Sequence, residues 1–199
     1  DKCAEKGIVV FNTPGANANA VKELVLTALF ISSRKIIDSY NWAQSLKGTE
    51  GVAATVEKGK SQFAGPEITG KTLGIVGLGA IGVLVANAAV ALGMKVIGYD
   101  PFLSVNGALK LDGSVKYTEK LDDIYAESDY ITVHVPLTSD TKEMFCKESF
   151  AKMKDGVRII NLARGELVNT EDIKTAIKEG KVARFVTDFP NENTVDVEG

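Results

Sequence analysis

The sequence predicts an α/β fold, a doubly wound parallel sheet with helices on both faces. From residue 71 onward, short apolar segments alternate with segments whose apolar residues recur at helical spacing. The apolar segments are continuous, as in Ile159-Ile160, which is typical of strands buried on both faces. The first of them runs into a G-x-G-x-x-G turn that opens a helix. These features favour parallel strands joined by helical crossovers in one sheet.

The expected elements follow from these patterns in order along the chain. An apolar run predicts a short strand over residues 7–12. The spacing of Val25, Ala28 and Leu29 predicts a helix over residues 17–33 that continues toward residue 46, and the polar, glycine-dotted stretch 47–70 predicts a loop. Strands are then expected at residues 72–77, 95–99, 114–117, 130–134, 157–162 and 182–187, and helices at residues 80–92, 120–126, 147–153 and 171–179. Thr170 is the expected cap of the last helix.

Composition and charge restrict the class of protein. The 199 residues carry a net charge of −3, so the chain lacks the basic character of a nucleic-acid binder. Hydrophobic residues at 45% and charged residues at 25% are typical of a soluble globular domain. Residues 75–94 are apolar but broken by glycines, which predicts buried core and not a membrane span. The two cysteines, Cys3 and Cys146, form neither a disulfide framework nor a metal-ligand cluster, which favours a cytoplasmic protein without a bound metal.

The glycine-rich turn predicts a site for the pyrophosphate of a dinucleotide. Gly77 permits the tight turn, Gly79 lets the backbone approach the phosphates, and Gly82 lets the helix pack closely on the strand. The backbone N–H groups of Ala80 and Ile81, at the start of the helix, are placed to bind the anion.

Asp100 ends the next predicted strand, near the position, about 20 residues after the turn, where a ribose-binding acid is expected. A carboxylate there accepts a hydrogen bond from a free 2′-hydroxyl and repels a 2′-phosphate, so NAD is favoured over NADP. The alternative is a turn needed only for packing, with Asp100 as a solvated acid. The order of strand, turn, helix, strand and acid favours the coenzyme site.

Other polar residues follow the predicted strands, where ligands bind in open parallel sheets. His134 and Asp188 each end a strand, Arg164 follows another, and Glu192 comes shortly after Asp188. Arg164 can hold a carboxylate with two hydrogen bonds, or it can be a surface arginine. His134 is a candidate general base, although a strand-end histidine whose ring bonds to the backbone is the favoured interpretation. Asp188 can accept from a carboxamide or simply end its strand.

These residues and several motifs resemble the D-isomer-specific 2-hydroxyacid dehydrogenases over almost the whole chain. The motifs are the Gly77 turn, VFNTP at 10–14, VKEL at 21–24, HVPL at 134–137 and NLARG at 161–165. Enzymes of this family oxidise D-2-hydroxy acids with NAD, and their nucleotide-binding domain is inserted in a substrate-binding domain. The resemblance implies that residues 1–13 are a remnant of the substrate-binding domain and that residues 14–199 are the NAD-binding domain.

The resemblance also implies roles for individual positions. Arg164 matches the catalytic arginine, which touches substrate and coenzyme, and Asn17 matches an asparagine close to the substrate. Glu192 is assigned as the catalytic glutamate, although the usual spacing after Asp188 falls on Asn193. The positions that match coenzyme contacts are Gly77, Gly79, Ala80, Ile81, Gly82, Asp100, His134, Val135, Pro136, Leu162, Ala163, Arg164 and Asp188. The family's catalytic histidine lies in a Pro-His-x-Gly motif that these 199 residues do not include, so the isolated chain is expected to bind NAD without turnover.

The resemblance leaves the particular function open. It implies a small hydroxy acid as substrate, and 3-phosphoglycerate, at the start of serine synthesis, is the favoured one, with hydroxypyruvate, lactate and a phosphonate as alternatives. A non-catalytic NAD(H)-sensing module is the alternative, because such relatives keep the same turn and arginine. In similar proteins the long helix and the segment after it form a two-fold dimer. We therefore expect a homodimer through this domain, with neither nucleic acid nor a membrane as partner.

Overall fold

The computed structural model describes residues 2–13, 15–192 and 194–195, and its centre is one six-stranded sheet. The strand order is β3-β2-β1-β4-β5-β6, and every neighbouring pair is parallel. The strands are β1 (Thr72–Val76), β2 (Lys95–Tyr99), β3 (Lys116–Thr118), β4 (Tyr130–Val133), β5 (Val157–Asn161) and β6 (Val182–Thr187). The doubly wound α/β class is confirmed, although β3 begins two residues later than expected.

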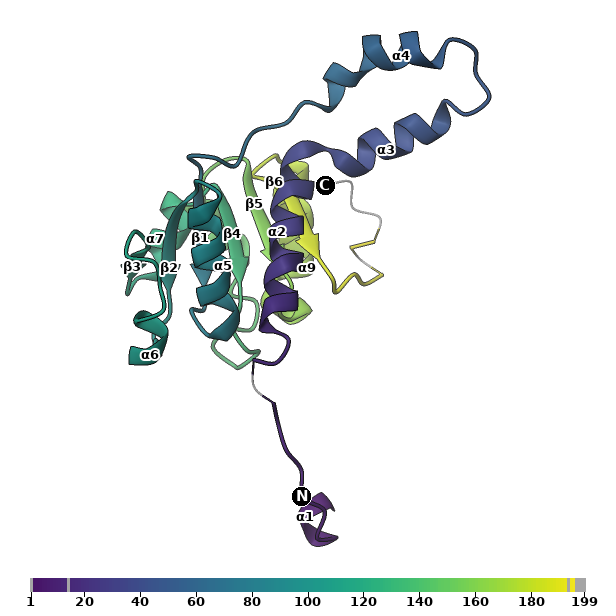
Figure 1. Cartoon of the computed structure of the whole chain (residues 1–199). Coiled ribbons are helices and arrows are strands. Elements are labelled where there is room, and N and C mark those ends of the chain that lie inside the picture. The colour runs from purple at the N-terminus through teal and green to yellow at the C-terminus, as the bar shows by residue number, and fades with distance from the viewer. Residues whose placement is uncertain (1, 14, 193, 196–199) are drawn as a thin grey trace.

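Helices cover both faces of the sheet (Figure 1). On one face, α2 (Ala18–Arg34) and α5 (Ala80–Ala91) pack side by side, and Leu29 joins a buried cluster with Ile160. On the other face lie α7 (Leu121–Glu127), α8 (Lys147–Lys152) and α9 (Thr170–Lys178), and Phe150 joins a second cluster with Ile159. Ile159 and Ile160 point to opposite faces and are both fully buried, which explains the continuous apolar run.

Asn169 caps α9, which corrects the expectation for Thr170. The Asn169 side chain accepts a hydrogen bond of 3.0 Å from the backbone N–H of Asp172, and Thr170 is the first residue of the helix. Asparagine is as good an N-cap as serine or aspartate and better than threonine. The short helix α6 (Val105–Ala108) has a similar cap, in which Ser104 accepts from the N–H of Gly107.

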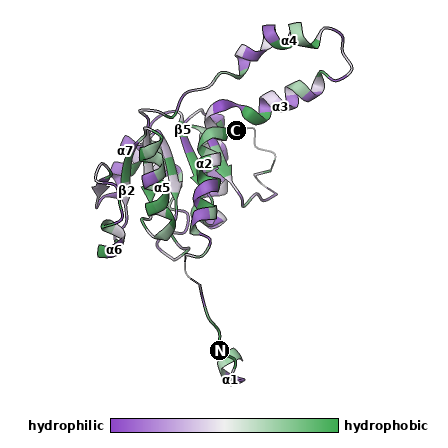
Figure 2. Ribbon diagram, in the orientation of Figure 1, coloured by the Kyte–Doolittle hydropathy of each residue, from purple (hydrophilic) through white to green (hydrophobic). Residues whose placement is uncertain are grey.

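The strand expected over residues 7–12 is wrong. After the short helix α1 (Lys2–Glu5), residues 8–13 are irregular, and Val9 and Phe11 are 73% and 85% exposed. Figure 2 shows this apolar tail extending away from the body. A strand needs a neighbour for its backbone N–H and C=O groups, and the described part of the chain supplies none here.

The loop expected over residues 47–70 is wrong for half of its length, because residues 52–63 are helical. α3 (Ile36–Ser45), α4 (Val52–Gly59) and the 3-10 helix η1 (Lys60–Phe63) form a projection that we call the arm, residues 36–63 (Figure 1). The rings of Trp42 and Phe63 pack at 5.2 Å between centroids and join its two sides. No residue of these three helices is buried.

The arm joins the body through two closely packed chain segments. Lys35 has a positive φ of 47° and separates α2 from α3, and its Nζ donates a hydrogen bond of 3.3 Å to the carbonyl of Gln62. Gly65, on the return, crosses so close to Ser33 that a Cβ there would lie 1.9 Å from the Ser33 carbonyl oxygen. Only glycine fits at this crossing.

The apolar stretch 75–94 forms the end of β1, the glycine-rich turn and α5. Val85, Ala86 and Ala89 of α5 are fully buried, as expected for core. Among the described residues, none of the helices has the length and apolar character needed to cross a membrane.

Candidate functional site

Five parallel strands end on the same rung of the sheet, and the residues that follow them form the candidate site. The rung consists of Tyr99, Val76, Val133, Asn161 and Thr187. The residues that follow are Asp100, Gly77, His134, Leu162 and Asp188. Short backbone bonds extend the row, because the N–H of Gly77 donates to Tyr99 at 2.8 Å and that of His134 donates to Val76 at 2.7 Å. The strand order reverses between β1 and β4, which is where open α/β sheets bind their ligands.

The glycine-rich turn has the shape of a pyrophosphate cradle. Gly77 has a φ of +97°, and a Cβ there would lie 2.7 Å from the carbonyl oxygen of His134. A Cβ on Gly82 would lie 2.0 Å from the Gly77 carbonyl oxygen, whereas the space above Gly79 is open. α5 begins at Ala80 without a side-chain cap, so the first-turn N–H groups have no intrahelical partner. An anion can approach them over Gly79.

Asp100 is fixed beside this turn. Its Oδ2 accepts a hydrogen bond of 2.8 Å from the N–H of Leu78, inside the turn, and its Oδ1 accepts one of 2.8 Å from Phe102. The carboxylate is partly buried and keeps further lone pairs for a ligand hydroxyl. Tyr117 donates to the Asp100 carbonyl at 3.1 Å and ties this end of β2 to β3.

Asn17 lies at the start of α2, next to the same turn. It occupies the N-cap position but makes no side-chain cap bond, and its side chain is exposed. A Cβ on Gly15 would lie 3.4 Å from the Cβ of Ala80, so the segment before α2 contacts the start of α5. The Asn17 amide can therefore form hydrogen bonds with a ligand bound near the start of α5.

His134 bonds to a side chain and not to the backbone, which corrects the sequence interpretation. Its Nε2 lies 3.0 Å from Oγ1 of Thr132, a fully buried residue two positions earlier on the same side of β4. Burial lowers the pKa of His134 to about 4, so the ring is neutral at physiological pH. Val135 packs on the adjacent core, and the Pro136 carbonyl accepts from the Thr141 hydroxyl at 2.7 Å.

Asn161 shapes the loop that carries Arg164, a role that the sequence analysis did not assign. Its fully buried amide donates to the Arg164 carbonyl at 2.7 Å and accepts from the N–H groups of Ala163 and Arg164 at 3.1 and 3.3 Å. The Arg164 guanidinium donates once, at 2.6 Å, to the Ala163 carbonyl and is otherwise exposed. The sequence did contain a signal for this role, because an asparagine at the end of a buried apolar strand needs hydrogen-bond partners, and the loop that follows supplies them.

Asp188 and Glu192 are both exposed after β6. A Cβ on Gly165 would lie 3.3 Å from the Cβ of Phe189, so the Arg164 loop packs against the residue that follows Asp188. The alternative glutamate position, Asn193, lies outside the described residues.

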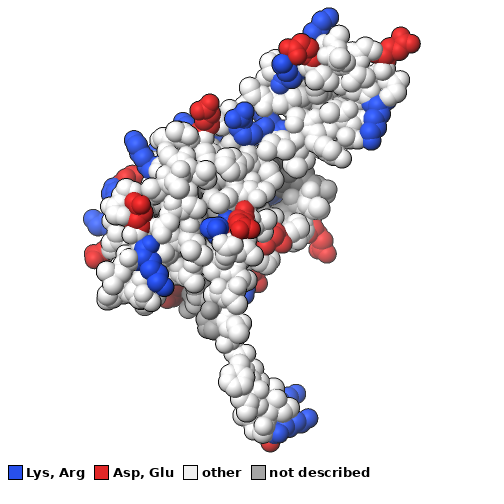
Figure 3. Space-filling model, viewed as in Figure 1, with Lys and Arg blue, Asp and Glu red and all other residues white. Residues whose placement is uncertain are grey.

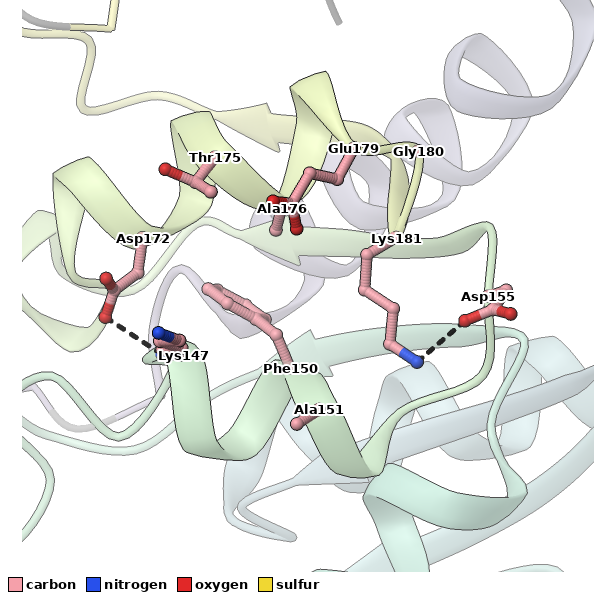
Figure 4. Close-up of a pocket in the computed structure, with 10 residues that line it drawn as sticks. All are labelled: Lys147, Phe150, Ala151, Asp155, Asp172, Thr175, Ala176, Glu179, Gly180 and Lys181. Carbon is pink, nitrogen blue, oxygen red and sulfur yellow. Dashed lines mark hydrogen bonds and ion pairs between the residues drawn. The ribbon is translucent and has the colours of Figure 1, made fainter.

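A groove of about 680 Å³ between α8 and α9 is a separate feature (Figure 4). Lys181 and Asp155 form an ion pair at 2.8 Å there, and the carboxylate of Asp172 accepts a hydrogen bond of 2.9 Å from the backbone N–H of Lys147. None of the predicted site residues lines it. Within the described ranges, His, Cys, Asp and Glu side chains form no cluster of three that could hold a metal.

The strand order, the switch point, the cradle and Asp100 define a dinucleotide-binding domain of the Rossmann type. The chain belongs to the D-isomer-specific 2-hydroxyacid dehydrogenase family, whose NAD-binding domain matches residues 26–198. NAD is therefore its coenzyme, as expected from the turn and Asp100.

Three similar proteins illustrate the family. The hydroxypyruvate reductase of Thermotoga maritima is 43% identical over 91% of this chain and 54% of its own length. The D-3-phosphoglycerate dehydrogenase of Methanocaldococcus jannaschii is 36% identical over 96% of this chain and 34% of its own length. The crystal structure of Aquifex aeolicus D-lactate dehydrogenase with NAD and lactic acid has a TM-score of 0.77 at 31% identity, covering 96% of this chain and 54% of that one. The chain thus spans about half or less of these relatives.

We expect His134 to stay neutral down to about pH 5. Below about pH 6.5 the unfolded chain binds a proton at this ring that the folded chain does not. The contribution of His134 to stability is therefore complete above pH 6.5 and decreases as the pH falls toward 4, by about 1–2 kcal/mol at pH 5. The ring proton shifts in NMR, which belong to the only histidine, should be flat from pH 8 to 5. A midpoint near 6.5 would contradict this. Urea unfolding of the wild type and of His134→Gln at pH 8 and at pH 5 measures this contribution. The variant should lack the part of the loss in unfolding free energy that comes from His134.

Asp100→Ala should narrow the preference for NADH over NADPH. The variant loses the acceptor for the ribose hydroxyl and the repulsion of a 2′-phosphate, so NADH should bind about tenfold or more weakly while NADPH gains. Calorimetric titration with each nucleotide measures both. Asp100→Asn is the matched control, because its amide oxygen can still accept from Leu78 while the charge is gone. If the ratio of NADH affinity to NADPH affinity were unchanged in both variants, Asp100 would not be the residue that distinguishes the 2′-hydroxyl from a 2′-phosphate.

Proposed function

We propose that this chain is the coenzyme-binding part of a cytoplasmic, NAD-dependent dehydrogenase that oxidises D-3-phosphoglycerate, the reaction that opens serine synthesis. Residues 14–199 are assigned to the NAD-binding domain and residues 1–13 to the substrate-binding domain. The observation that carries the proposal is the shared rung, which aligns the turn and Asp100 with the Arg164 loop and Asp188. Coenzyme and substrate groups are thereby presented along one edge.

Arg164 is proposed to bind the substrate carboxylate and the developing carbonyl oxygen. Among the described residues its guanidinium has one hydrogen bond, to the carbonyl of Ala163, and the side chain of Asn161 bonds to its loop. A planar guanidinium binds a carboxylate with two parallel hydrogen bonds and stabilises negative charge on a neighbouring oxygen. Asn17, across the row, is proposed to contact the substrate from the α2 side.

NAD, when bound, supplies the acceptor for the hydride that leaves C2 of the hydroxy acid. The proton of the C2 hydroxyl is proposed to go to the histidine of the family's Pro-His-x-Gly motif, which these 199 residues do not include and which Glu192 is proposed to orient. His134 is a poor base for this step, because its pKa is about 4 and its Nε2 is bonded to Thr132. We propose instead that His134, Val135 and Pro136 border the coenzyme ribose, and that Leu162, Ala163 and Asp188 border the nicotinamide.

The assignment of 3-phosphoglycerate is supported by the phosphoglycerate dehydrogenase relative, whose similarity extends over 96% of this chain. The hydroxypyruvate reductase relative has the higher identity, 43%, over 91% of the chain, which makes hydroxypyruvate the second candidate. A non-catalytic NAD(H)-sensing module remains the alternative from a different functional class.

The test compares substrates in the full-length enzyme. We expect kcat/KM for D-3-phosphoglycerate to exceed that for D-glycerate and D-lactate, and Arg164→Lys to reduce it by about a hundredfold or more, because lysine lacks the planar fork. Arg184→Lys, at an arginine within β6, is the matched control and should retain activity. The 199-residue chain alone should bind NADH without turnover.

Other outcomes separate the alternatives. A higher kcat/KM for hydroxypyruvate reduction would refute the phosphoglycerate assignment and keep the family activity. Tight NADH binding with no turnover of any D-2-hydroxy acid would support the sensing module.

We also propose that two copies of the chain associate through the arm. The arm leaves Ile37 52% and Tyr40 61% exposed, and α2 leaves Leu24 exposed below it. Figure 3 shows charged side chains of both signs scattered over this face, with wide uncharged areas between them. A second copy could cover these apolar side chains, which single soluble domains seldom expose together.

Tyr40→Glu should weaken the dimer by about tenfold or more, because it places a charge in the proposed interface. Sedimentation equilibrium of the 199-residue chain measures the association. Val105→Glu, at an exposed apolar residue of α6 on the body, is the control and should leave the association unchanged. A wild-type chain that is monomeric at all concentrations, or an equal effect of both variants, would contradict the proposal.

A further inference from the structure

A small polar cavity lies at the amino ends of β1, β4 and β5, on the edge of the sheet opposite the glycine-rich turn. Its volume is about 160 Å³. Its lining includes three cations, Lys71, Lys154 and Arg158, and the carboxylates of Asp129 and Asp155. Each of these residues precedes or begins a strand of the central sheet.

The two carboxylates are already neutralised by other groups. Asp129 accepts from the N–H of Thr72 at 2.8 Å and from Lys154 at 3.2 Å. Burial raises the pKa of Asp129, but the Thr72 bond and Lys154 outweigh burial, so that the pKa lies below its usual value and the group stays ionised. Asp155 is exposed and contacts Lys181 at 2.8 Å.

Lys71 acts on Asp129 only through a longer-range charge interaction, which helps to lower the pKa of that carboxyl, and Arg158 has no acidic partner among the described residues. No ion pair joins either of them to a described Asp or Glu. The cavity therefore has uncompensated positive charge, although the chain as a whole has a net charge of −3.

The Arg158 guanidinium is held in one orientation. Its Nε donates a hydrogen bond of 3.0 Å to the Ser32 carbonyl, and its Cζ lies 5.3 Å from the centroid of the Tyr130 ring. The Tyr130 hydroxyl is itself 2.8 Å from Oγ of Ser33. Nη1 makes only a long contact of 3.5 Å to the Gly156 carbonyl, so most of the terminal N–H groups keep their capacity to donate.

We propose that this cavity binds a small oxyanion, with Arg158 and Lys71 as its ligands. A half-buried guanidinium that is fixed in one orientation, in the same cavity as an ammonium, can bind phosphate or carboxylate oxygens. The site is distinct from the coenzyme cradle, because it lies at the other end of the strands. Pro66, on the chain returning from the arm, also lines the cavity, so a bound anion would link the base of the arm to the sheet.

The test is calorimetric titration of the NADH-saturated 199-residue chain with inorganic phosphate at constant ionic strength. NADH occupies the cradle, which would otherwise bind phosphate itself. We expect one saturable site, and a loss of affinity of about tenfold or more in Arg158→Lys and in Lys71→Gln. Titration with acetate in place of phosphate tells whether a carboxylate also fits.

Lys147→Gln, at an exposed lysine of the α8–α9 groove, is the matched control and should bind phosphate as the wild type does. The proposal is overturned if the wild type shows no saturable binding, or if Lys147→Gln and Lys71→Gln weaken it equally. Lys71→Gln keeps the test decisive if Arg158→Lys disturbs the fold, because the Lys71 side chain is exposed.

Discussion

The parallel register of the sheet is the constraint on which the candidate site depends. Continuous apolar strands pack almost equally well one residue out of register, because both faces are buried. Polar groups at the strand ends remove this ambiguity. At the amino ends, Asp129 accepts from the N–H of Thr72, and its carbonyl accepts from the N–H of Arg158 at 3.0 Å. At the carboxyl ends, buried Asn161 closes the loop of Arg164. These bonds hold the ends of β1, β4 and β5 in register, which aligns Gly77 and His134 with the loop of Arg164.

The sequence predicted the sheet and its covering helices because their signals are local. Apolar runs, helical periodicity and the glycine-rich turn each depend on neighbours within one element, so β1, β2, β4, β5 and β6 lie where they were expected. The errors concern segments whose state depends on distant partners. The run 7–12 has strand composition but no described strand beside it. Residues 52–63 have weak periodicity and are helical in an arm held together by Trp42 and Phe63.

The site was predicted less completely than the fold, for similar reasons. The cradle and Asp100 follow from one spacing rule, whereas Asn161 acts through bonds to the loop after it, which composition does not reveal. The partner of His134 was within reach of sequence reasoning, since residues two apart on a strand point to the same side and Thr132 is the residue in question. The side chain at the family's glutamate position depends on the conformation of the segment after β6, which no periodicity describes.

The two chain segments that join the arm to the body, at Lys35 and Gly65, tolerate fewer amino-acid substitutions than the arm itself. No residue of α3 or α4 is buried, so substitutions there leave the core of the sheet and the coenzyme edge undisturbed, whereas Ile37 and Tyr40 are constrained by the proposed dimer contact. Gly65 cannot be substituted in the same way, because any side chain there would collide with the Ser33 carbonyl and push apart the two chain segments that join the arm to the body. A single missing methyl group thus sets the angle at which the arm leaves the body. An arm of different length or sequence can therefore be accommodated at this crossing only if the glycine at position 65 is kept.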